Sequence, residues 1–128
     1  MRRLVVCGLI GALLLAVTGC MATANADVVV REYLDLVIKD DLDKAYALLT
    51  AVAKADYPKD RYLADMAATE AELGALSSYK VTGQRMPGST TASVTVTLTY
   101  TRDNATKQVP FVFGCFNERG QWRIANYK

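Results

Sequence analysis

The sequence ASVTVTLTY, at residues 92–100, alternates strictly between apolar and hydroxyl-bearing side chains until its final tyrosine. Successive side chains of a β-strand point to opposite faces of a sheet, so Val94, Val96 and Leu98 share one face and the threonines share the other. The stretch therefore predicts a half-buried antiparallel strand with one face in water.

Three further strands are expected around this one. Their ranges are 77–86, 108–116 and 121–127. Turn-forming residues, rich in Gly, Pro, Asn and Asp, separate the four strands at 86–89, 103–104 and 118–120. Short turns between successive strands predict an antiparallel meander.

The part of the chain before the strands has a helical period instead. Two helices are expected at 27–39 and 42–49, the first capped by Asp27, and Asp40-Asp41 between them offers the N-cap of the second. A third helix is expected between Asp56 as its cap and Gly74 just past its end, with Pro58 in its first turn. Three helices followed by four antiparallel strands predict a single α+β domain at 27–128, with the helices on one face of the sheet.

This element order, with the closing GQWRI at 120–124, resembles the nuclear transport factor two-like superfamily. Its members curl a sheet around a long helix into a cone. The segments VREYLDL at 30–36 and DLDKAYALL at 41–49 are similar to the first two helices of small bacterial envelope proteins of that kind. The resemblance implies a cone-like fold that typically holds a pocket. It implies no single activity, because the superfamily includes ketosteroid isomerase-like enzymes, dehydratases and binding modules.

Residues 1–19 have the composition of an export signal, with a basic start and an apolar run from Leu4 to Val17. That run is shorter than the ~20 residues of a membrane span. The sequence Val17-Thr18-Gly19-Cys20 resembles the lipobox of bacterial lipoproteins, whose cysteine receives diacylglycerol. We therefore expect cleavage before Cys20, lipid on Cys20, a short tether at 20–26 and attachment to a membrane of the cell envelope.

A second cleavage site follows a few residues later. Ala24-Asn25-Ala26 is an A-x-A motif, and cleavage after it would release a soluble protein that begins at Asp27. We favour the lipobox because it lies directly at the end of the apolar run. Met21, rather than Asp, follows Cys20, which resembles lipoproteins of the outer membrane if the host is Gram-negative.

The charge distribution argues against a nucleic-acid partner. Loss of the export signal removes Arg2 and Arg3, so the formal net charge falls from +2 to 0. The sequence contains no basic run of the kind that phosphate binding requires. Acids outnumber bases up to Leu73 and bases outnumber acids from Gly74 onward, which is typical of acidic helix surfaces that meet basic strand surfaces.

The sequence has few of the side chains that usually catalyse reactions or bind metals. The chain has no histidine, which excludes His-based triads and removes the commonest metal ligand. Cys115 lies among aromatic residues and is expected to be a core thiol, although it could form a disulfide with Cys20 if that residue carries no lipid. We expect no metal and no cofactor.

Five residues form the candidate ligand-binding set. Tyr33, Tyr46, Tyr100 and Trp122 could wall a pocket for an apolar ligand, although large aromatics in a small domain usually fill the core. Glu70 falls inside the apolar stripe of the third helix, and with a tyrosine it is the only acid–base combination for an isomerase or hydratase. That enzyme needs a buried Glu70 carboxylate that faces a cavity.

Our leading hypothesis is a non-catalytic, membrane-anchored domain that binds a small apolar ligand or an envelope protein partner. The enzyme that would use Glu70 is one alternative. A structural accessory of an envelope complex, recognised through an exposed apolar patch or sheet edge, is the other.

Overall fold

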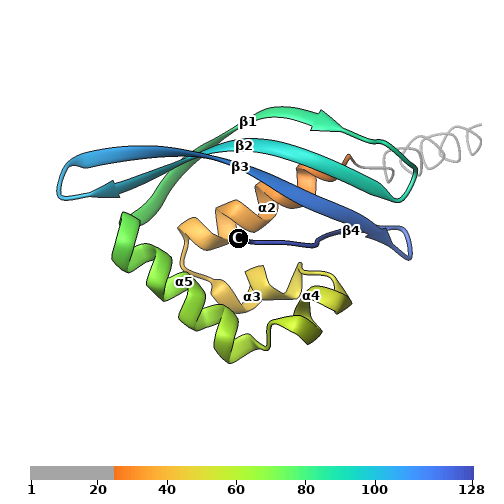
Figure 1. Ribbon diagram of the computed structural model, residues 1–128, viewed down its shortest axis with the longest axis horizontal. Helices are drawn as coiled ribbons and strands as arrows, with labels where there is room; N and C mark the ends of the chain where they lie inside the picture. The colour runs from red at the N-terminus through yellow and green to blue at the C-terminus, as the bar shows by residue number, and fades with distance from the viewer. Residues whose placement is uncertain (1–24) are drawn as a thin grey trace, which may run out of the picture.

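The computed structural model describes residues 25–128, so the expected export signal, Cys20 and most of the tether lie outside the described residues. Four helices precede four strands (Figure 1), and the predicted α+β class is confirmed. The elements are α2 Ala26–Ile38, α3 Leu42–Ala47, α4 Ala51–Asp56, α5 Lys59–Leu73, β1 Ala75–Arg85, β2 Thr91–Arg102, β3 Ala105–Glu118 and β4 Gln121–Ile124. Between Asn25 and Lys128, no helix is both long enough and apolar enough to cross a membrane.

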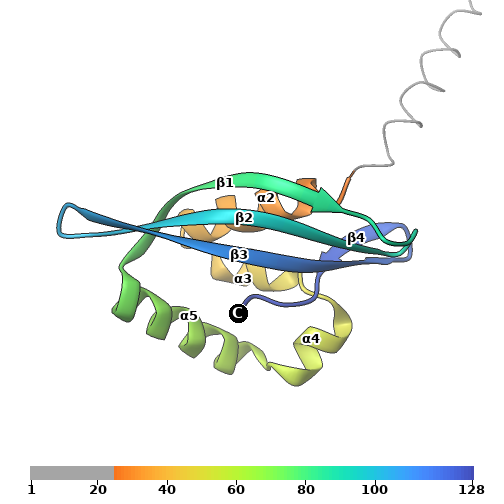
Figure 2. The same ribbon diagram turned by 45° about the horizontal axis from the view of Figure 1, so that its top comes forward.

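The strands form the expected antiparallel meander, in the order β1-β2-β3-β4. The helices lie on one side of this sheet, and the other side is uncovered (Figure 2). Val94 and Val96 of β2 are fully buried on the covered face, where Val94 is opposite Phe113 of β3. The threonines between them face the uncovered side, as the alternation of ASVTVTLTY predicts.

The described helices number four, one more than the sequence predicts, because residues 51–56 form a helix of their own. Its N-cap is Thr50, whose hydroxyl accepts a hydrogen bond of 3.1 Å from the backbone N–H of Ala53. The expectation that Asp56 caps the following helix is wrong, because Asp56 is the last residue of α4. Helix α5 begins at Lys59, directly after Pro58.

The start of α2 also differs from the prediction. The helix begins at Ala26 with Asn25 in the cap position, so Asp27 lies in the first turn instead of capping it. There the Asp27 carboxylate pairs with Arg31 at 3.2 Å, and the backbone N–H of Asp27 donates to the side-chain oxygen of Gln84 at 2.8 Å. The predicted cap of α3 is confirmed, since the side chain of Asp41 accepts from a backbone N–H of the first turn.

Strand β4 ends earlier than predicted, and the chain after α3 pairs with its end. Its last residue is Ile124, whose N–H donates to Leu48 and whose carbonyl accepts from the N–H of Thr50, at 2.9 and 2.8 Å. Leu49 thus forms an isolated parallel bridge with Ile124 at the free edge of β4. For the same reason α3 ends at Ala47 instead of continuing to residue 49.

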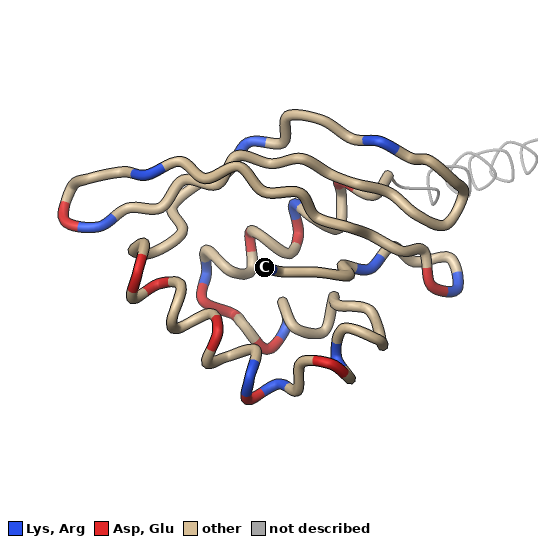
Figure 3. The backbone as a smooth tube through the Cα atoms, in the orientation of Figure 1, with Lys and Arg blue, Asp and Glu red and all other residues tan. Residues whose placement is uncertain are grey.

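Gly74 connects the helical half of the chain to the sheet. Its φ of +95° lies in a region that side chains with a Cβ rarely adopt, and a Cβ there would overlap the carbonyl oxygen of Thr101. The tight turn directs β1 along β2. Acidic residues concentrate in the helical layer, as the charge pattern predicts, whereas basic residues lie on both the helices and the strands (Figure 3).

Candidate functional site

Aromatic side chains fill the middle of the space between the sheet and the helices. The rings of Tyr33 and Phe113 meet edge to face at 5.9 Å, and each residue is 2% exposed. The hydroxyl of Tyr33 shares a hydrogen bond of 2.9 Å with that of Tyr62 on α5. Burial is the main cause that raises the pKa of Tyr33 well above its ordinary value. Tyr33 is therefore a core residue that joins α2 to α5.

Tyr46 is also part of the packing. Its hydroxyl lies 3.1 Å from the carbonyl oxygen of Lys54 and 2.8 Å from that of Tyr57, so it ties α3 to the end of α4. Its ring packs against Tyr62 with the centroids 5.1 Å apart. With these contacts, Tyr46 stabilises the helical layer and lines neither of the hollows described below.

The last residues of the chain fold back onto α5 instead of continuing the predicted strand. The ring of Tyr127 packs against Tyr62 at 4.8 Å, and its hydroxyl donates to the carboxylate of Asp65 at 2.7 Å. Lys128 pairs with the same carboxylate at 3.1 Å. The hydrogen bond from Tyr127, followed by the one from Lys128, lowers the pKa of Asp65.

An apolar cleft lies between α2 and α5, near the junction of α5 with β1. It has a volume of about 610 Å³, which is within the usual range of small-molecule sites. We call it the α2–α5 cleft. Its apolar lining comes from α2, α3, α5 and the first two strands: Val37, Ile38, Leu42, Leu63, Met66, Ala67, Ala71, Ala75, Leu76 and Tyr100.

Polar groups also line this cleft. The hydroxyl of Tyr100 makes no hydrogen bond within residues 25–128, and burial raises its pKa, so it is protonated at neutral pH. Asp40, Thr69 and Glu70 contribute the polar side chains of the lining. The hydroxyl of Thr69 already donates to a backbone carbonyl of α5 at 3.1 Å. Tyr100 is therefore the uncharged hydrogen-bonding group of the lining that has no partner within residues 25–128.

Glu70 does not meet the requirement of the isomerase hypothesis. Its side chain is exposed, and its carboxylate makes no hydrogen bond to a tyrosine in the described part of the chain. Its backbone carbonyl accepts from Gly74 at 2.8 Å and from the guanidinium of Arg102 at 3.2 Å. Glu70 thus lies in the last turn of α5 beside the cleft, where its exposed carboxylate is in water instead of facing an enclosed cavity.

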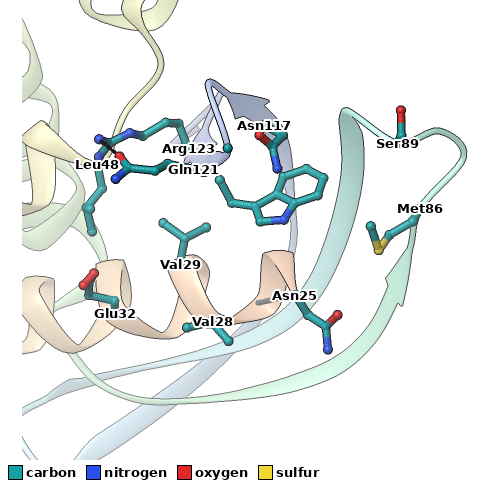
Figure 4. Close-up of a pocket in the computed structure, with 12 residues that line it drawn as sticks. Asn25, Val28, Val29, Glu32, Leu48, Met86, Ser89, Asn117, Gln121 and Arg123 are labelled. Carbon is teal, nitrogen blue, oxygen red and sulfur yellow. Dashed lines mark hydrogen bonds between the residues drawn. The ribbon is translucent and has the colours of Figure 1, made fainter. Parts of the chain in front are cut away.

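A second hollow lies at the other end of α2, beside the β1–β2 and β3–β4 turns (Figure 4). We call it the Trp122 hollow, and its volume is about 770 Å³. Apolar and polar side chains both line it: Asn25, Val28, Val29, Glu32, Leu48, Met86, Ser89, Asn117, Gln121, Trp122 and Arg123. Figure 4 shows Val28, Val29 and Glu32 along α2, with Asn117 and Met86 beyond them.

The structure therefore divides the five candidate residues among three places. Tyr33 and Tyr46 belong to the packed core, Glu70 and Tyr100 line the α2–α5 cleft, and Trp122 lines the hollow at the opposite end. Sequence reasoning did not assign Leu42 or Leu63 to a site. Their helical spacing was visible, but it equally fits residues buried in a core.

Cys115 has the expected position of a core thiol. It is 1% exposed, and burial raises the pKa of the thiol to about 12. Cys20 lies outside the described residues, so a Cys20–Cys115 disulfide stays a prediction. Within residues 25–128, no three acidic or cysteine side chains lie close enough together to hold a metal ion.

Comparison with known proteins identifies the fold and not the activity. No protein-family model and no curated protein matches the sequence. Among solved structures, a SEC-C motif containing protein from Rhodopseudomonas palustris is similar over 82% of this chain and 77% of its own, with a TM-score of 0.66 and 13% identity. A Campylobacter jejuni protein described as an NTF2-like transpeptidase is similar over 81% of this chain and 100% of its own, with a TM-score of 0.60 and 10% identity. The second likeness supports the NTF2-like fold that the sequence resembles.

Proposed function

We propose that this chain is a lipid-anchored protein of a bacterial cell envelope, whose domain binds a small, neutral, largely apolar ligand in the α2–α5 cleft. The observation that carries the binding role is the cleft itself, which combines about 610 Å³ of space, an apolar lining and the unpaired hydroxyl of Tyr100. The observation that carries the anchor is the sequence Val17-Thr18-Gly19-Cys20 at the end of an apolar run.

The chemistry of the cleft favours a largely apolar ligand that is not an anion. An apolar lining gives most of the binding free energy, at about 25 cal/mol for each Å² of apolar surface removed from water. Asp40 and Glu70 at the cleft disfavour an anion, because a carboxylate near like charges loses hydration without gaining a partner. The Tyr100 hydroxyl orients the ligand through one hydrogen bond.

A binding role fits the residues of the cleft better than a catalytic role. Proton transfer needs an acid or base whose pKa is close to the working pH, which for a carboxyl group requires burial or a nearby like charge. Glu70 is exposed. The Tyr100 hydroxyl has a raised pKa and can donate a hydrogen bond but is a poor proton acceptor at neutral pH.

The anchor is tested by intact-protein mass spectrometry of the membrane fraction from cells that express the full chain, beside a Cys20→Ala variant. We expect a lipid-sized mass increment on Cys20 that the variant lacks. A soluble product that begins at Asp27 would instead show that the A-x-A site is used and that the protein is free to diffuse.

The cleft is tested with the neutral fluorescent probe N-phenyl-1-naphthylamine, added to the full chain in lipid nanodiscs, with empty nanodiscs as the background. Ala67 and Ala68 are neighbours on α5 and both are exposed, but only Ala67 lines the cleft. We expect Ala67→Phe to fill the cleft and weaken saturable binding by roughly tenfold or more, about 1.4 kcal/mol. Ala68→Phe, which changes helix propensity equally, should leave binding unchanged.

Either of two outcomes would contradict the ligand role. The probe could fail to bind above the nanodisc background, or the two variants could bind it equally. An envelope protein that co-purifies with the wild-type chain, and is lost from Ala67→Phe alone, would instead assign the cleft to a protein partner.

A further inference from the structure

We propose that the Trp122 hollow and the apolar side chains around it rest against the lipid bilayer that holds Cys20, so that this end of the domain is a membrane-contacting surface. The proposal rests on the proposed function, because the lipid on Cys20 is what brings the bilayer to the domain. It adds an orientation, with the Trp122 hollow toward the membrane and the α2–α5 cleft away from it.

The start of α2 fixes the place where the tether leaves the domain. Asn25 lines the Trp122 hollow, and Ala26 directly after it is completely buried. The hydrogen bond of 2.8 Å from the N–H of Asp27 to Gln84 holds the first turn of α2 against β1. Cys20 comes five residues before Asn25. Fully extended chain spans at most ~3.6 Å per residue, so the lipid-bearing residue stays within about 18 Å of this hollow.

Two exposed apolar side chains line the hollow, and a third lies at the same end of the sheet. Val28, Met86 and Phe116 are 52%, 46% and 47% exposed, although water-facing positions normally favour polar residues. Val28 and Met86 line the hollow together with Trp122. Phe116 is at the same end of β3, opposite Thr91, and follows the buried Cys115, so its side chain lies on the uncovered face of the sheet and not in the hollow. A patch of this kind marks an interaction surface, and tryptophan is enriched where a protein meets the membrane interface.

The charged residues at this end also fit an interface with lipid headgroups. Arg85 precedes Met86, and Arg119 lies in the β3–β4 turn. Arginine can lay its apolar stem along a hydrophobic surface while its guanidinium stays among the headgroups. Glu32 and Glu118 lie in the same region, and Glu118 already accepts a hydrogen bond of 3.2 Å from the N–H of Ala51. The two acids keep the attraction to anionic lipid modest, so apolar contact is the main contribution.

Trp122 is the single tryptophan of the chain and therefore a site-specific reporter. The test uses the lipidated full chain in phosphatidylcholine–phosphatidylglycerol vesicles, in which the phosphatidylcholine acyl chains carry bromine, a contact quencher of tryptophan fluorescence. We expect a loss of Trp122 fluorescence relative to vesicles without bromine. If the anchored protein shows no loss of Trp122 fluorescence, the proposal is wrong. That outcome includes the case in which the acyl chain on Cys20 fills the hollow in place of bilayer lipid.

A matched set of variants tests whether the quenching depends on this surface or on non-specific binding of the domain to the membrane. Val28→Asp combined with Met86→Asp puts two charges into the contact and should reduce the bromine-dependent quenching. Val52→Asp is the control, because Val52 is 70% exposed on α4 and does not line the hollow. Equal quenching in all three proteins would overturn the proposal, as would an equal reduction by both sets of changes. Circular dichroism checks that the variants fold.

Flotation of the vesicles before the fluorescence measurement distinguishes failure of the lipid anchor from failure of the membrane contact. A wild-type chain that does not float with the vesicles, and lacks the lipid mass on Cys20, removes the anchor and with it the membrane contact. A chain that floats without bromine quenching of Trp122 keeps the anchor and rejects only the contact.

Discussion

The hydroxyl oxygens of Tyr33 and Tyr62 lie 2.9 Å apart in the interior, and this hydrogen bond joins the first described helix to the last. The two residues are 2% and 0% exposed. Because water does not reach them, each hydroxyl has the other as its hydrogen-bond partner. The pair connects α5, which has few other buried side chains, to the core of the sheet.

Removal of one of these two hydroxyls should lower the unfolding free energy more than removal of both. Tyr33→Phe or Tyr62→Phe leaves the other hydroxyl buried without a partner, which costs about 1–3 kcal/mol of unfolding free energy. The double variant should lose less than the sum of the two. Urea denaturation measures all three, with Tyr57→Phe as the control because the Tyr57 hydroxyl makes no hydrogen bond within residues 25–128. Additive losses would contradict a coupled pair.

Stability should be lost in alkali. Burial raises the pKa of Tyr62 from 10.0 to about 12 and that of the Cys115 thiol from 9.0 to about 12, so the folded state holds these protons more tightly than the unfolded chain. Their contribution is therefore complete below about pH 9 and is lost as the pH rises toward about 12. Urea midpoints across this range measure it. In Cys115→Ala the decline should begin nearer pH 10, and an unchanged onset would contradict the role of the thiol.

Cys115 should be unreactive in the folded protein. Its 1% exposure and raised pKa leave neither access nor thiolate for Ellman's reagent at neutral pH. We expect no reaction from the lipidated protein until urea unfolds it, and then one thiol per chain. A fast-reacting thiol before unfolding would show either an open core or a Cys20 that carries no lipid, and Cys20→Ala distinguishes the two.

The two glycines at positions 74 and 83 should respond oppositely to a methyl group. Gly74→Ala places a Cβ at φ +95° and against the carbonyl of Thr101, so backbone strain alone should cost about 1–3 kcal/mol. Gly83→Ala meets no atom within 4 Å and should change stability by less than about 0.5 kcal/mol. Thermal or urea unfolding measures both, and equal losses would contradict the special conformation of Gly74.

The carboxyl of Asp65 should titrate below its ordinary pKa of 3.8, mainly because Tyr127 donates a hydrogen bond to it. A lowered pKa means that the stabilisation is present above pH 3.8 and is lost as the pH falls through the folded-state value. Tyr127→Phe should raise the pKa of Asp65 toward 3.8 in an NMR titration of its side-chain carbon. An unchanged pKa would show that Lys128 alone holds the carboxylate ionised.

The sheet was the most predictable part of this fold, and α4 the least. Val94, Val96 and Leu98 alternate with threonines, which is the pattern of a strand with one buried face. The observed β2 extends just beyond the predicted range. Half of residues 51–56 are alanine, and the segment carries no apolar stripe, so its helix depends on the Thr50 cap and on the hydroxyl of Tyr46. Neither contact has a periodic signal in the sequence.

The candidate residues were harder to predict than the elements that carry them. Tyr33, Tyr100 and Trp122 are similar in the sequence, since each is an aromatic residue on an apolar face. Packing makes the first a core residue and leaves the other two beside separate hollows. The difference depends on which partners fill the space around each ring, and those partners come from distant parts of the chain.

By itself, the sequence determined the order of the four strands and of three of the four helices, and the face that β2 buries. These features follow from local periodicity, which every short segment carries within itself. Only the tertiary structure decided that Tyr33 meets Tyr62, that Tyr127 returns to α5, and that Leu42 and Tyr100 line one cleft. Such contacts join residues far apart in the chain, and their positions are fixed by close packing of the whole domain.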